Sequence, residues 1–270
     1  MNENNQMSGA EAVIKALVEN GVEVIFGYPG GAVLPLYDAL FKNKKIKHIL
    51  VRHEQAAVHA AEGYARSTGK VGCVLVTSGP GATNAITGLT DALMDSVPIV
   101  CLSGQVPTHL IGTDAFQEAD TTGISRPCTK HNYLVKNADL LCAIVHESFE
   151  IASSGRPGPV LIDLPKDIQL TNIKYLKKPT KINKKLTTIL PQIDIQMISQ
   201  VADLLVYSEK PIIYAGGGVV NAGLEASQLL TELVELLNSP VTLTLMGLGA
   251  VSNKNKNFLG MLRMHGTYEA

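Results

Sequence analysis

The sequence is poor in aromatic residues and in charge. Its 270 residues include no tryptophan, aromatic residues make up 5% of the chain, and charged residues make up 17%. The formal net charge is -1, and lysine and arginine form no long run. Binding to nucleic acid or to an anionic membrane surface needs a basic patch, so this balance argues against both partners.

Cysteine is scarce as well. The four cysteines stand far apart, without a CxxC pair or zinc-finger spacing: Cys73, Cys101, Cys128 and Cys142. Three of them lie in apolar runs, as reduced core cysteines do. The HExxH motif of zinc proteases is also absent, because Ala57 stands where the second histidine would be needed. We therefore predict no metal-binding residues in this chain.

Signals for export and for membrane insertion are missing. The first residues, MNENNQMSG, contain neither an apolar core nor an arginine-rich amphipathic pattern, so no signal or transit peptide is expected. No apolar run is long enough to span a membrane. The sequence predicts a cytoplasmic protein, and its 46% hydrophobic residues are enough for a buried core.

What the sequence does have is a repeated unit of helix, short apolar run and glycine-rich turn. Ser8 and Glu11 form the pattern of a capping box, after which apolar residues recur at helical spacing as far as Gly21. The predicted strands of the first part are Ile46–Val51, Val71–Thr77, Pro98–Ser103, His131–Val135 and Pro159–Leu164, in addition to Val22–Phe26. The predicted helices between them include Glu54–Ser67, Ala82–Met94 and Ala138–Ser153. This alternation predicts an α/β fold, a parallel sheet covered by helices.

The length suits one and a half to two domains. We expect a first domain over residues 8–170, a linker rich in Lys, Thr, Asn and Pro over 171–190, and a second domain over 191–270. In the second domain, helices at Ile195–Tyr207 and Leu224–Leu237 accompany only two clear strands, Pro211–Ala215 and Val241–Met246. Two strands cannot bury an α/β core, so we expect an incomplete Rossmann-like domain and an N-terminal fragment of a longer protein.

Three turns at predicted strand ends could carry chemistry. Glu54 begins a helix directly after a strand, at the sheet edge where α/β proteins bind ligands, although a first-turn acid that complements the helix dipole is the alternative. The turns Tyr28–Gly31 and Thr77–Asn84 are rich in glycine and allow close backbone approach. Asn84 stands where a dinucleotide fingerprint has its last glycine. The alternative that this segment is a tight turn that binds no ligand therefore remains. Neither turn is a Walker loop.

Taken together, these segments resemble a known family. RHEQAAVHAAEGYARSTGK and TSGPGATN are similar to the pyrimidine-binding domain of thiamine-diphosphate decarboxylases and carboligases. GQVPTHLIGTDAFQE and SGRPGPVLIDLPKD resemble the FAD-containing acetolactate synthases (acetohydroxyacid synthases) within that superfamily. The similarity runs from about Ser8 to the end of the chain. It implies a pyrimidine-binding domain followed by an FAD-associated central domain.

The resemblance implies a transferase activity. Acetolactate synthases decarboxylate pyruvate with thiamine diphosphate and join the product to a second 2-keto acid, pyruvate or 2-ketobutyrate, in valine, leucine and isoleucine biosynthesis. It implies thiamine diphosphate, Mg²⁺ and FAD as cofactors, the FAD without a redox role in the net reaction. The implied partners are small 2-keto acids, a second copy of the chain in at least a homodimer, and a small regulatory subunit.

The same resemblance assigns residues. Glu54 matches the acid that hydrogen-bonds N1′ of the aminopyrimidine ring, and Gln117 matches a residue near the reacting centre. Matches to the aminopyrimidine pocket are Tyr28, Pro29, Gly30, Thr77, Pro80 and Asn84. Matches to the substrate channel are Gly31, Ala32, Pro107, Ala115, Phe116 and Lys166. Matches to FAD contacts are Arg156, Gly216, Gly217, Gly218, Thr244, Leu245, Met246 and His265.

Two departures from the family pattern are clear. Arg263 stands where the family has glycine, and no GDG motif for Mg²⁺ and diphosphate occurs in the sequence. We therefore expect the metal site on a missing domain, and we expect these residues alone to be inactive. The alternatives are another thiamine-diphosphate enzyme, such as a pyruvate oxidase or glyoxylate carboligase, and a non-catalytic truncated domain. Glu54 and the GTDAFQE segment favour acetolactate synthase, since glyoxylate carboligase lacks the acid.

Overall fold

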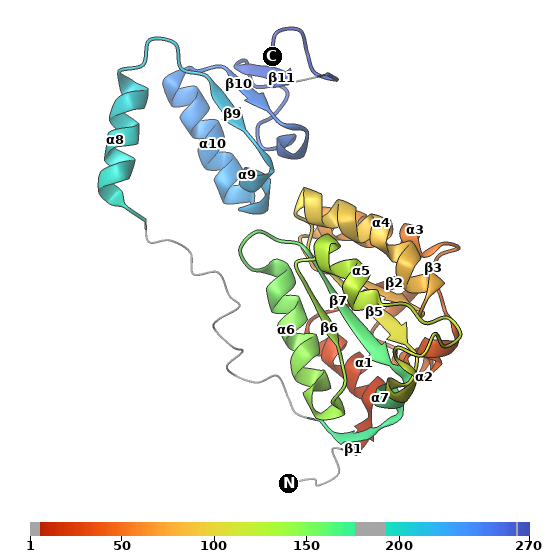
Figure 1. Cartoon of the computed structure of the whole chain (residues 1–270). Coiled ribbons are helices and arrows are strands. Elements are labelled where there is room, and N and C mark those ends of the chain that lie inside the picture. Colours follow the sequence, from red (N-terminus) through yellow and green to blue (C-terminus); the bar gives the residue numbers. More distant parts are fainter. Residues whose placement is uncertain (1–5, 176–192, 263) are drawn as a thin grey trace. The chain divides into compact units, whose positions relative to one another are not determined.

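A computed structural model describes residues 6–175, 193–262 and 264–270 of the chain (Figure 1). The chain divides into two compact units, Met1–Leu190 and Pro191–Ala270. Both units are α/β, and the first contains the parallel sheet covered by helices that the sequence predicts. Within the described ranges, no helix combines the length and the apolar character required to cross a bilayer.

The first unit is built on a six-stranded sheet in the order β3-β2-β4-β5-β7-β6, and every neighbouring pair is parallel. The strands are β2 (Val24–Gly27), β3 (Lys47–Leu50), β4 (Gly72–Val76), β5 (Ile99–Gln105), β6 (His131–Leu134) and β7 (Pro159–Pro165). Every residue of β4, β5 and β7 is buried. Burial on both faces explains why these segments read as continuous apolar runs rather than alternating ones.

Helices cover both faces of this sheet (Figure 1). They are α1 (Gly9–Glu19), α2 (Leu34–Lys42), α3 (Glu54–Thr68), α4 (Pro80–Asp95), α5 (Thr121–Ser125), α6 (Leu141–Ser153) and α7 (Lys166–Leu170). Successive strand residues point to opposite faces, so Leu75 joins the apolar cluster of α1, α2 and α6, whereas Val74 joins that of α3 and α4. The unit therefore has three layers, with two apolar cores separated by the sheet.

The capping box at the start of α1 is confirmed. Ser8 Oγ accepts a hydrogen bond from the Glu11 amide (3.2 Å), and Glu11 Oε2 accepts one from the Ser8 amide (2.9 Å). These reciprocal bonds satisfy two backbone donors that a helix start otherwise leaves unpaired. At the other end, Gly21 has φ 78 and lets the chain turn away from the helix.

We predict that Ser8→Ala lowers the free energy of unfolding of the first unit by about 1 kcal/mol, because the Glu11 amide loses its acceptor. Urea unfolding followed by circular dichroism measures this loss. Ser67→Ala is the matched control, because Ser67 lies in the last turn of α3 and its hydroxyl donates to the Tyr64 carbonyl of the same helix rather than to a helix-start amide. An equal loss in both variants would contradict a capping role for Ser8.

One short antiparallel pair was not predicted. Strand β1 (Gln6–Ser8) pairs with β8 (Asn172–Lys174), and Ile173 of β8 is buried. The linker expected from residue 171 therefore begins with a strand that belongs to the first unit. A three-residue strand is too short to show a periodic pattern, which is why the sequence did not reveal it. Residues 176–190 of the expected linker lie outside the described residues.

The second unit contains a parallel three-stranded sheet in the order β11-β10-β9. Its strands are β9 (Ile213–Ala215), β10 (Val241–Leu243) and β11 (Phe258–Met261), and its helices are α8 (Ile195–Val206), α9 (Gly217–Asn221) and α10 (Leu224–Leu237). The sequence predicted two strands for this unit, and that prediction was wrong, because the sheet has three. Strand β11 was not predicted from the sequence, because a run of four residues flanked by polar and glycine-rich segments gives a weak strand signal.

Candidate active site

Three turns meet at one edge of the first sheet. Strand β3 leads into Glu54, β2 leads into the Tyr28–Gly31 turn, and β4 leads into the Thr77–Pro80 turn. These three strands are direct neighbours and parallel, so their carboxyl ends share one edge. Such an edge is where open α/β sheets bind ligands. The residues that the sequence singled out separately are thus neighbours in space.

Glu54 is the first residue of α3, and its side chain is turned away from bulk solvent. The residue is 8% exposed, and its Oε2 accepts a hydrogen bond from Asn84 Nδ2 on α4 (2.9 Å). His53 caps the helix, its Nδ1 accepting from the Gln55 amide (3.2 Å). A carboxylate used only as a solvated helix acid would not be buried and held by a neighbouring helix. Burial and the contact with Asn84 therefore distinguish Glu54 from a solvated helix acid.

The two helices that carry Glu54 and Asn84 approach each other closely. A Cβ atom at Gly88 of α4 would lie 2.5 Å from the Cβ of Val58 on α3, so only glycine fits there. Ala57 and Ala61 are fully buried at the same contact. This close packing brings the amide of Asn84 within hydrogen-bonding reach of the Glu54 carboxylate.

Thr77 joins the two glycine turns. A Cβ atom at Gly30 would lie 2.5 Å from Thr77 Oγ1, and one at Gly81 would lie 2.7 Å from Thr77 Cγ2 and 3.4 Å from Glu54 Oε1. Thr77 Oγ1 is buried and has no hydrogen-bond partner among the described residues. A buried hydroxyl without a partner is costly and calls for one. A polar group bound beside Glu54 could provide it.

Gln117 is brought to the same edge by backbone packing. Gly79 has φ 56 and ψ -114, and a Cβ atom there would lie 2.5 Å from the carbonyl oxygen of Gln117. Gln117 itself has φ 57. The segment before it is held by Glu118, which accepts the amides of Gly112 and Ala115, the latter at 3.0 Å. These backbone hydrogen bonds keep the pKa of the Glu118 carboxyl below its usual value.

The remaining residues assigned to the channel follow strands further along this edge. Ala32 O accepts a hydrogen bond from Gln169 Nε2 (2.8 Å). Pro107 follows β5 and Lys166 follows β7, two neighbouring strands. Phe116 is 88% exposed. Tyr28 is partly exposed, and its amide donates to the Leu75 carbonyl (3.2 Å), which anchors the turn to β4.

Arg156 lies at the opposite edge. It precedes β7, and its guanidinium donates from Nε to Ser96 Oγ (2.7 Å) and from Nη2 to the Met94 carbonyl (2.8 Å). These acceptors are at the carboxyl end of α4, where a cation complements the helix dipole. The structure therefore separates Arg156 from Glu54 and gives it a contact that the sequence did not predict.

Two turns expected to contact FAD meet in the second unit. Gly216–Gly218 follows β9 and Thr244–Met246 follows β10, and the Thr244 amide donates to the Ala215 carbonyl (2.9 Å). A Cβ atom at Gly217 would lie 2.9 Å from Met246 Cβ. Leu245 and His265 are exposed. The turns share the carboxyl edge of the second sheet, whereas Arg263 lies outside the described residues.

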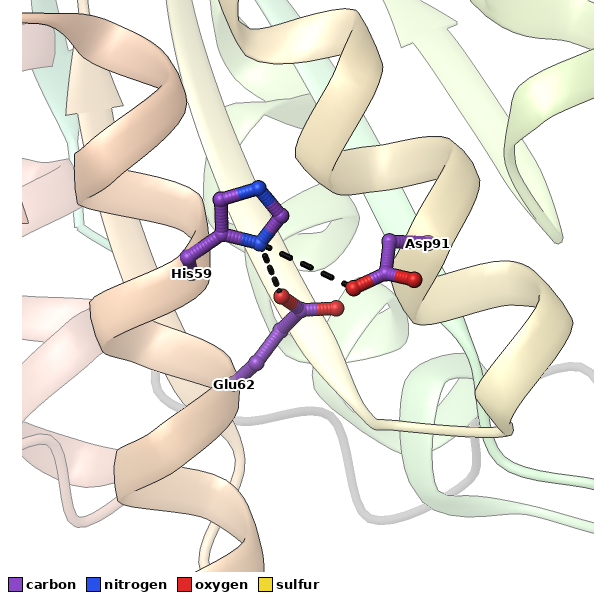
Figure 2. A group of neighbouring side chains, drawn as sticks. All are labelled: His59, Glu62 and Asp91. Atoms are coloured by element: carbon purple, nitrogen blue, oxygen red, sulfur yellow. Dashed lines mark hydrogen bonds and ion pairs between the residues drawn. The ribbon is translucent and has the colours of Figure 1, made fainter. Parts of the chain in front are cut away.

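A polar group that the sequence analysis missed lies between α3 and α4 (Figure 2). His59 Nδ1 is 2.6 Å from Glu62 Oε2 and 3.7 Å from Asp91 Oδ2. The potential ligand atoms of the three residues lie within 4.8 Å of one another. Burial raises the pKa of Glu62, and the hydrogen bond with His59 opposes this shift. The i, i+3 spacing of His59 and Glu62 was the sequence signal for two of these three residues.

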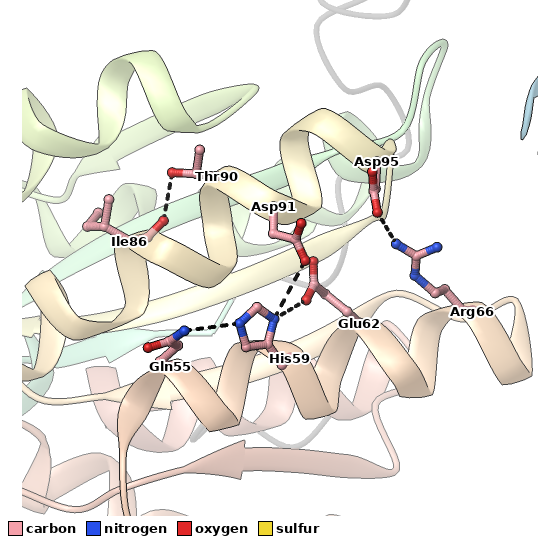
Figure 3. Close-up of polar contacts among 8 residues, drawn as sticks. All are labelled: Gln55, His59, Glu62, Arg66, Ile86, Thr90, Asp91 and Asp95. Carbon is pink, nitrogen blue, oxygen red and sulfur yellow. Dashed lines mark hydrogen bonds and ion pairs between the residues drawn. The ribbon is translucent and has the colours of Figure 1, made fainter. Parts of the chain in front are cut away.

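Figure 3 shows that this group belongs to a row of contacts along the α3–α4 seam. Gln55 Nε2 lies 3.4 Å from His59 Nε2, and Arg66 forms an ion pair with Asp95 at 2.6 Å. His59 thereby links two carboxylates that would otherwise repel each other. Exposed ion pairs such as Arg66–Asp95 contribute little free energy individually, whereas Glu62 is buried. Their clearest role is to connect the two helices that carry Glu54 and Asn84.

Comparison with known proteins agrees with this geometry. Residues 7–124 match the family model for the N-terminal TPP binding domain of thiamine pyrophosphate enzymes, and residues 198–270 match the model for their central domain. Thiamine pyrophosphate, or TPP, is another name for thiamine diphosphate. The chain belongs to the thiamine pyrophosphate enzymes and carries these two of their domains.

Within this class the chain is homologous to acetolactate synthase large subunits. It is 54% identical to the large subunit of Haemophilus influenzae and 53% identical to the isozyme 3 large subunit of Escherichia coli, in both cases over 98% of this chain and 46% of the relative. It is 51% identical to an acetolactate synthase of Mycobacterium bovis, over 98% of this chain and 42% of the relative. The chain thus spans less than half the length of these relatives.

Proposed function

We propose that this chain supplies the aminopyrimidine-binding half of an acetolactate synthase catalytic subunit. The reaction is the decarboxylation of pyruvate and its carboligation to a second 2-keto acid, pyruvate or 2-ketobutyrate, in branched-chain amino-acid biosynthesis. The observation that carries the proposal is the buried carboxylate of Glu54, held by Asn84 at the sheet edge where the glycine turns meet. The homology to acetolactate synthase large subunits supports the choice of reaction.

The residues at this edge fit an aminopyrimidine ring. Glu54 offers a buried carboxylate to a ring nitrogen, Thr77 offers a hydroxyl without a partner, and Gly30 and Gly81 present backbone without side chains. When bound, thiamine diphosphate would provide the carbon nucleophile and the electron sink of the reaction. Pro29 and Pro80 flank the same turns and would border the ring.

The chain's own part in the chemistry is to place and move a proton. The Glu54 carboxylate would hold a proton at the ring nitrogen, and Asn84 Nδ2 keeps its other oxygen in a fixed position. Burial keeps water from competing for that proton. Gln117 we propose as a residue near the reacting centre, since its backbone packs on the Gly79 turn beside this carboxylate.

FAD and Mg²⁺ are further parts of the proposal. The Gly216–Gly218 and Thr244–Met246 turns lie at the carboxyl edge of parallel strands, a position suited to a dinucleotide, and we propose FAD there. Arg156 stays a proposed FAD contact. Because the sequence contains no GDG motif, we propose that Mg²⁺ and the diphosphate group are bound by residues outside these 270.

The proposed assembly is a homo-oligomer, at least a dimer, in the cytoplasm. In it, Glu54 of one copy would face the diphosphate site of the other. Several relatives are named as large subunits, which supports a small regulatory subunit as a further partner. The proposed substrates are small 2-keto acids.

A chimera tests the proposal. This chain, joined to the remaining part of the Escherichia coli isozyme 3 large subunit, is expected to form acetolactate from pyruvate when thiamine diphosphate, Mg²⁺ and FAD are supplied. The 53% identity makes the exchange structurally reasonable. The 270-residue chain alone is expected to form none. A folded chimera that binds thiamine diphosphate but makes no acetolactate would overturn the proposed reaction.

A further inference from the structure

The loop of residues 106–119 connects β5 to the turn before α5, and it carries much of the expected channel. Pro107, Ala115, Phe116 and Gln117 all lie in it. Within this loop the chain forms only a single short turn of 3-10 helix, Thr108–Leu110. A loop of this length needs fixed points if it is to hold Gln117 in one place.

One buried side chain, that of Gln105, bonds both ends of this loop. Gln105 is the last residue of β5 and is 2% exposed. Its Oε1 accepts from the Val106 amide at the start of the loop (2.8 Å), and its Nε2 donates to the Ala119 carbonyl at the end (2.9 Å). Ala119 lies fourteen residues after Gln105, and the amide group of Gln105 therefore holds the two ends of the loop together.

Asp163 braces Gln105 from the neighbouring strand. Gln105 Nε2 also donates to Asp163 Oδ2 (2.9 Å), and Asp163 on β7 is 1% exposed. The other oxygen, Asp163 Oδ1, has no hydrogen-bond partner among the described residues. A buried charge of this kind would need a cation or several donors, and the groups that favour the charged form of this carboxyl are the Gln105 amide and the Ser103 hydroxyl.

The surroundings favour the neutral form of Asp163. Burial raises its pKa to about 8, and the nearby negative charge of Asp120, which precedes α5, acts in the same direction. The other titratable group that interacts with it is the thiol of Cys101 on β5, while β6 places Leu134 beside it. A neutral acid accepts the bond from Gln105 without the cost of burying a charge.

The loop beyond these bonds is held as a unit. Glu118, next to Ala119, accepts the amides of Gly112 and Ala115 and thereby fixes the shape of the segment that includes Phe116 and Gln117. The Gln117 carbonyl then packs on Gly79 at the start of α4. A shift at the root of the loop would therefore move Gln117 relative to the Gly79 turn and to Glu54.

We infer that Gln105, braced by Asp163, is a positioning residue that clamps both roots of the 106–119 loop and thereby sets where Gln117 lies beside the Glu54 site. Its consequence for catalysis rests on the proposed function, whereas the clamp itself is a property of the described residues. The two can therefore fail separately, and the clamp is testable without any activity assay.

Limited proteolysis of the 270-residue chain tests the clamp. Chymotrypsin cleavage after Phe116, which is 88% exposed, is followed by mass spectrometry under native conditions. Gln105→Met keeps the side-chain length but removes all three hydrogen bonds, so the cleavage rate after Phe116 is expected to rise about tenfold. Gln105→Asn is the milder second variant, because its amide is one methylene too short to reach both roots. It should shift the rate in the same direction.

Two variants of Asp163 separate the brace from simple packing. Asp163→Asn preserves a neutral acceptor for Gln105 Nε2 and should keep the cleavage rate within about twofold of the unmodified chain. Asp163→Leu removes the acceptor and should raise the rate as the Gln105 variants do. Identical behaviour of the Asn and Leu variants would overturn the neutral brace.

Cleavage after Phe41, which is 79% exposed at the end of α2, is the internal control and should not change. Equal increases after Phe41 and Phe116 in both Gln105 variants would show a global loss of structure and overturn a local clamp. An unchanged rate after Phe116 in both variants would also overturn it. Failure of the chimera to form acetolactate would leave this result unaffected.

Discussion

Replacing Glu54 by glutamine is expected to lower kcat for acetolactate formation by the chimera about 100-fold or more, the usual contribution of a positioned general acid–base group. Glutamine has the same size, and its Oε1 can still accept the hydrogen bond from Asn84 Nδ2. It cannot hold and return a proton at a ring nitrogen. Circular dichroism and thermal unfolding should match those of the unmodified chimera, since the packing between α3 and α4 is preserved.

Glu23→Gln is the control for this variant. Glu23 is exposed, and its carboxylate pairs with Lys70 Nζ at 2.7 Å on the surface. Removing a solvated surface charge should leave kcat unchanged. The assignment of Glu54 as the proton-handling group would be wrong if the Glu54→Gln chimera turned over as fast as the Glu23→Gln chimera.

Gly79→Ala is expected to have the largest effect on stability, lowering the free energy of unfolding of the first unit by about 3 kcal/mol. The backbone at Gly79, with φ 56 and ψ -114, is unfavourable for alanine, and the new Cβ would lie 2.5 Å from the Gln117 carbonyl. Both the strain and the contact act on the turn between Thr77 and α4. Differential scanning calorimetry should show a midpoint lowered by roughly 6–12 °C.

Gly69→Ala separates the two causes. Gly69 ends α3 with φ 70 and ψ 6, and no atom lies within 4 Å of the position of an added Cβ. In this variant only the left-handed backbone conformation is unfavourable, and the free energy of unfolding should fall by about 1 kcal/mol. A loss no larger in Gly79→Ala than in Gly69→Ala would mean that the contact with Gln117 does not hold the loop.

Much of the fold could be predicted from local patterns. Helix α10 begins and ends where the apolar spacing places it, Leu224–Leu237, and the capping box of α1 forms as predicted. Helix α4 begins at Pro80, two residues before the predicted start, because proline is tolerated in the first turn of a helix. The strands that were not predicted are β1, β8 and β11, segments of three or four residues in which too few residues alternate to leave a pattern.

The candidate site was predictable only in part. Each turn, around Gly30, Glu54 and Gly79, follows a strand and is visible locally, and the family resemblance connected them. The contacts that hold Gln117 were not visible. Gln105 and Asp163 lie 58 positions apart, and each reads as a polar residue within a buried strand until the order of β5 and β7 is known.

By itself the sequence determined where most of the helices and strands form, that the chain is α/β, and which turns contain glycine. These properties depend on neighbours along the chain, through hydrogen-bond geometry, capping and the alternation of apolar residues. Only the tertiary structure decided that Asn84 meets Glu54, that Arg156 lies at the other edge, and that His59 joins Asp91. Those contacts depend on strand order and helix packing, which bring distant residues together through burial rather than through any local rule.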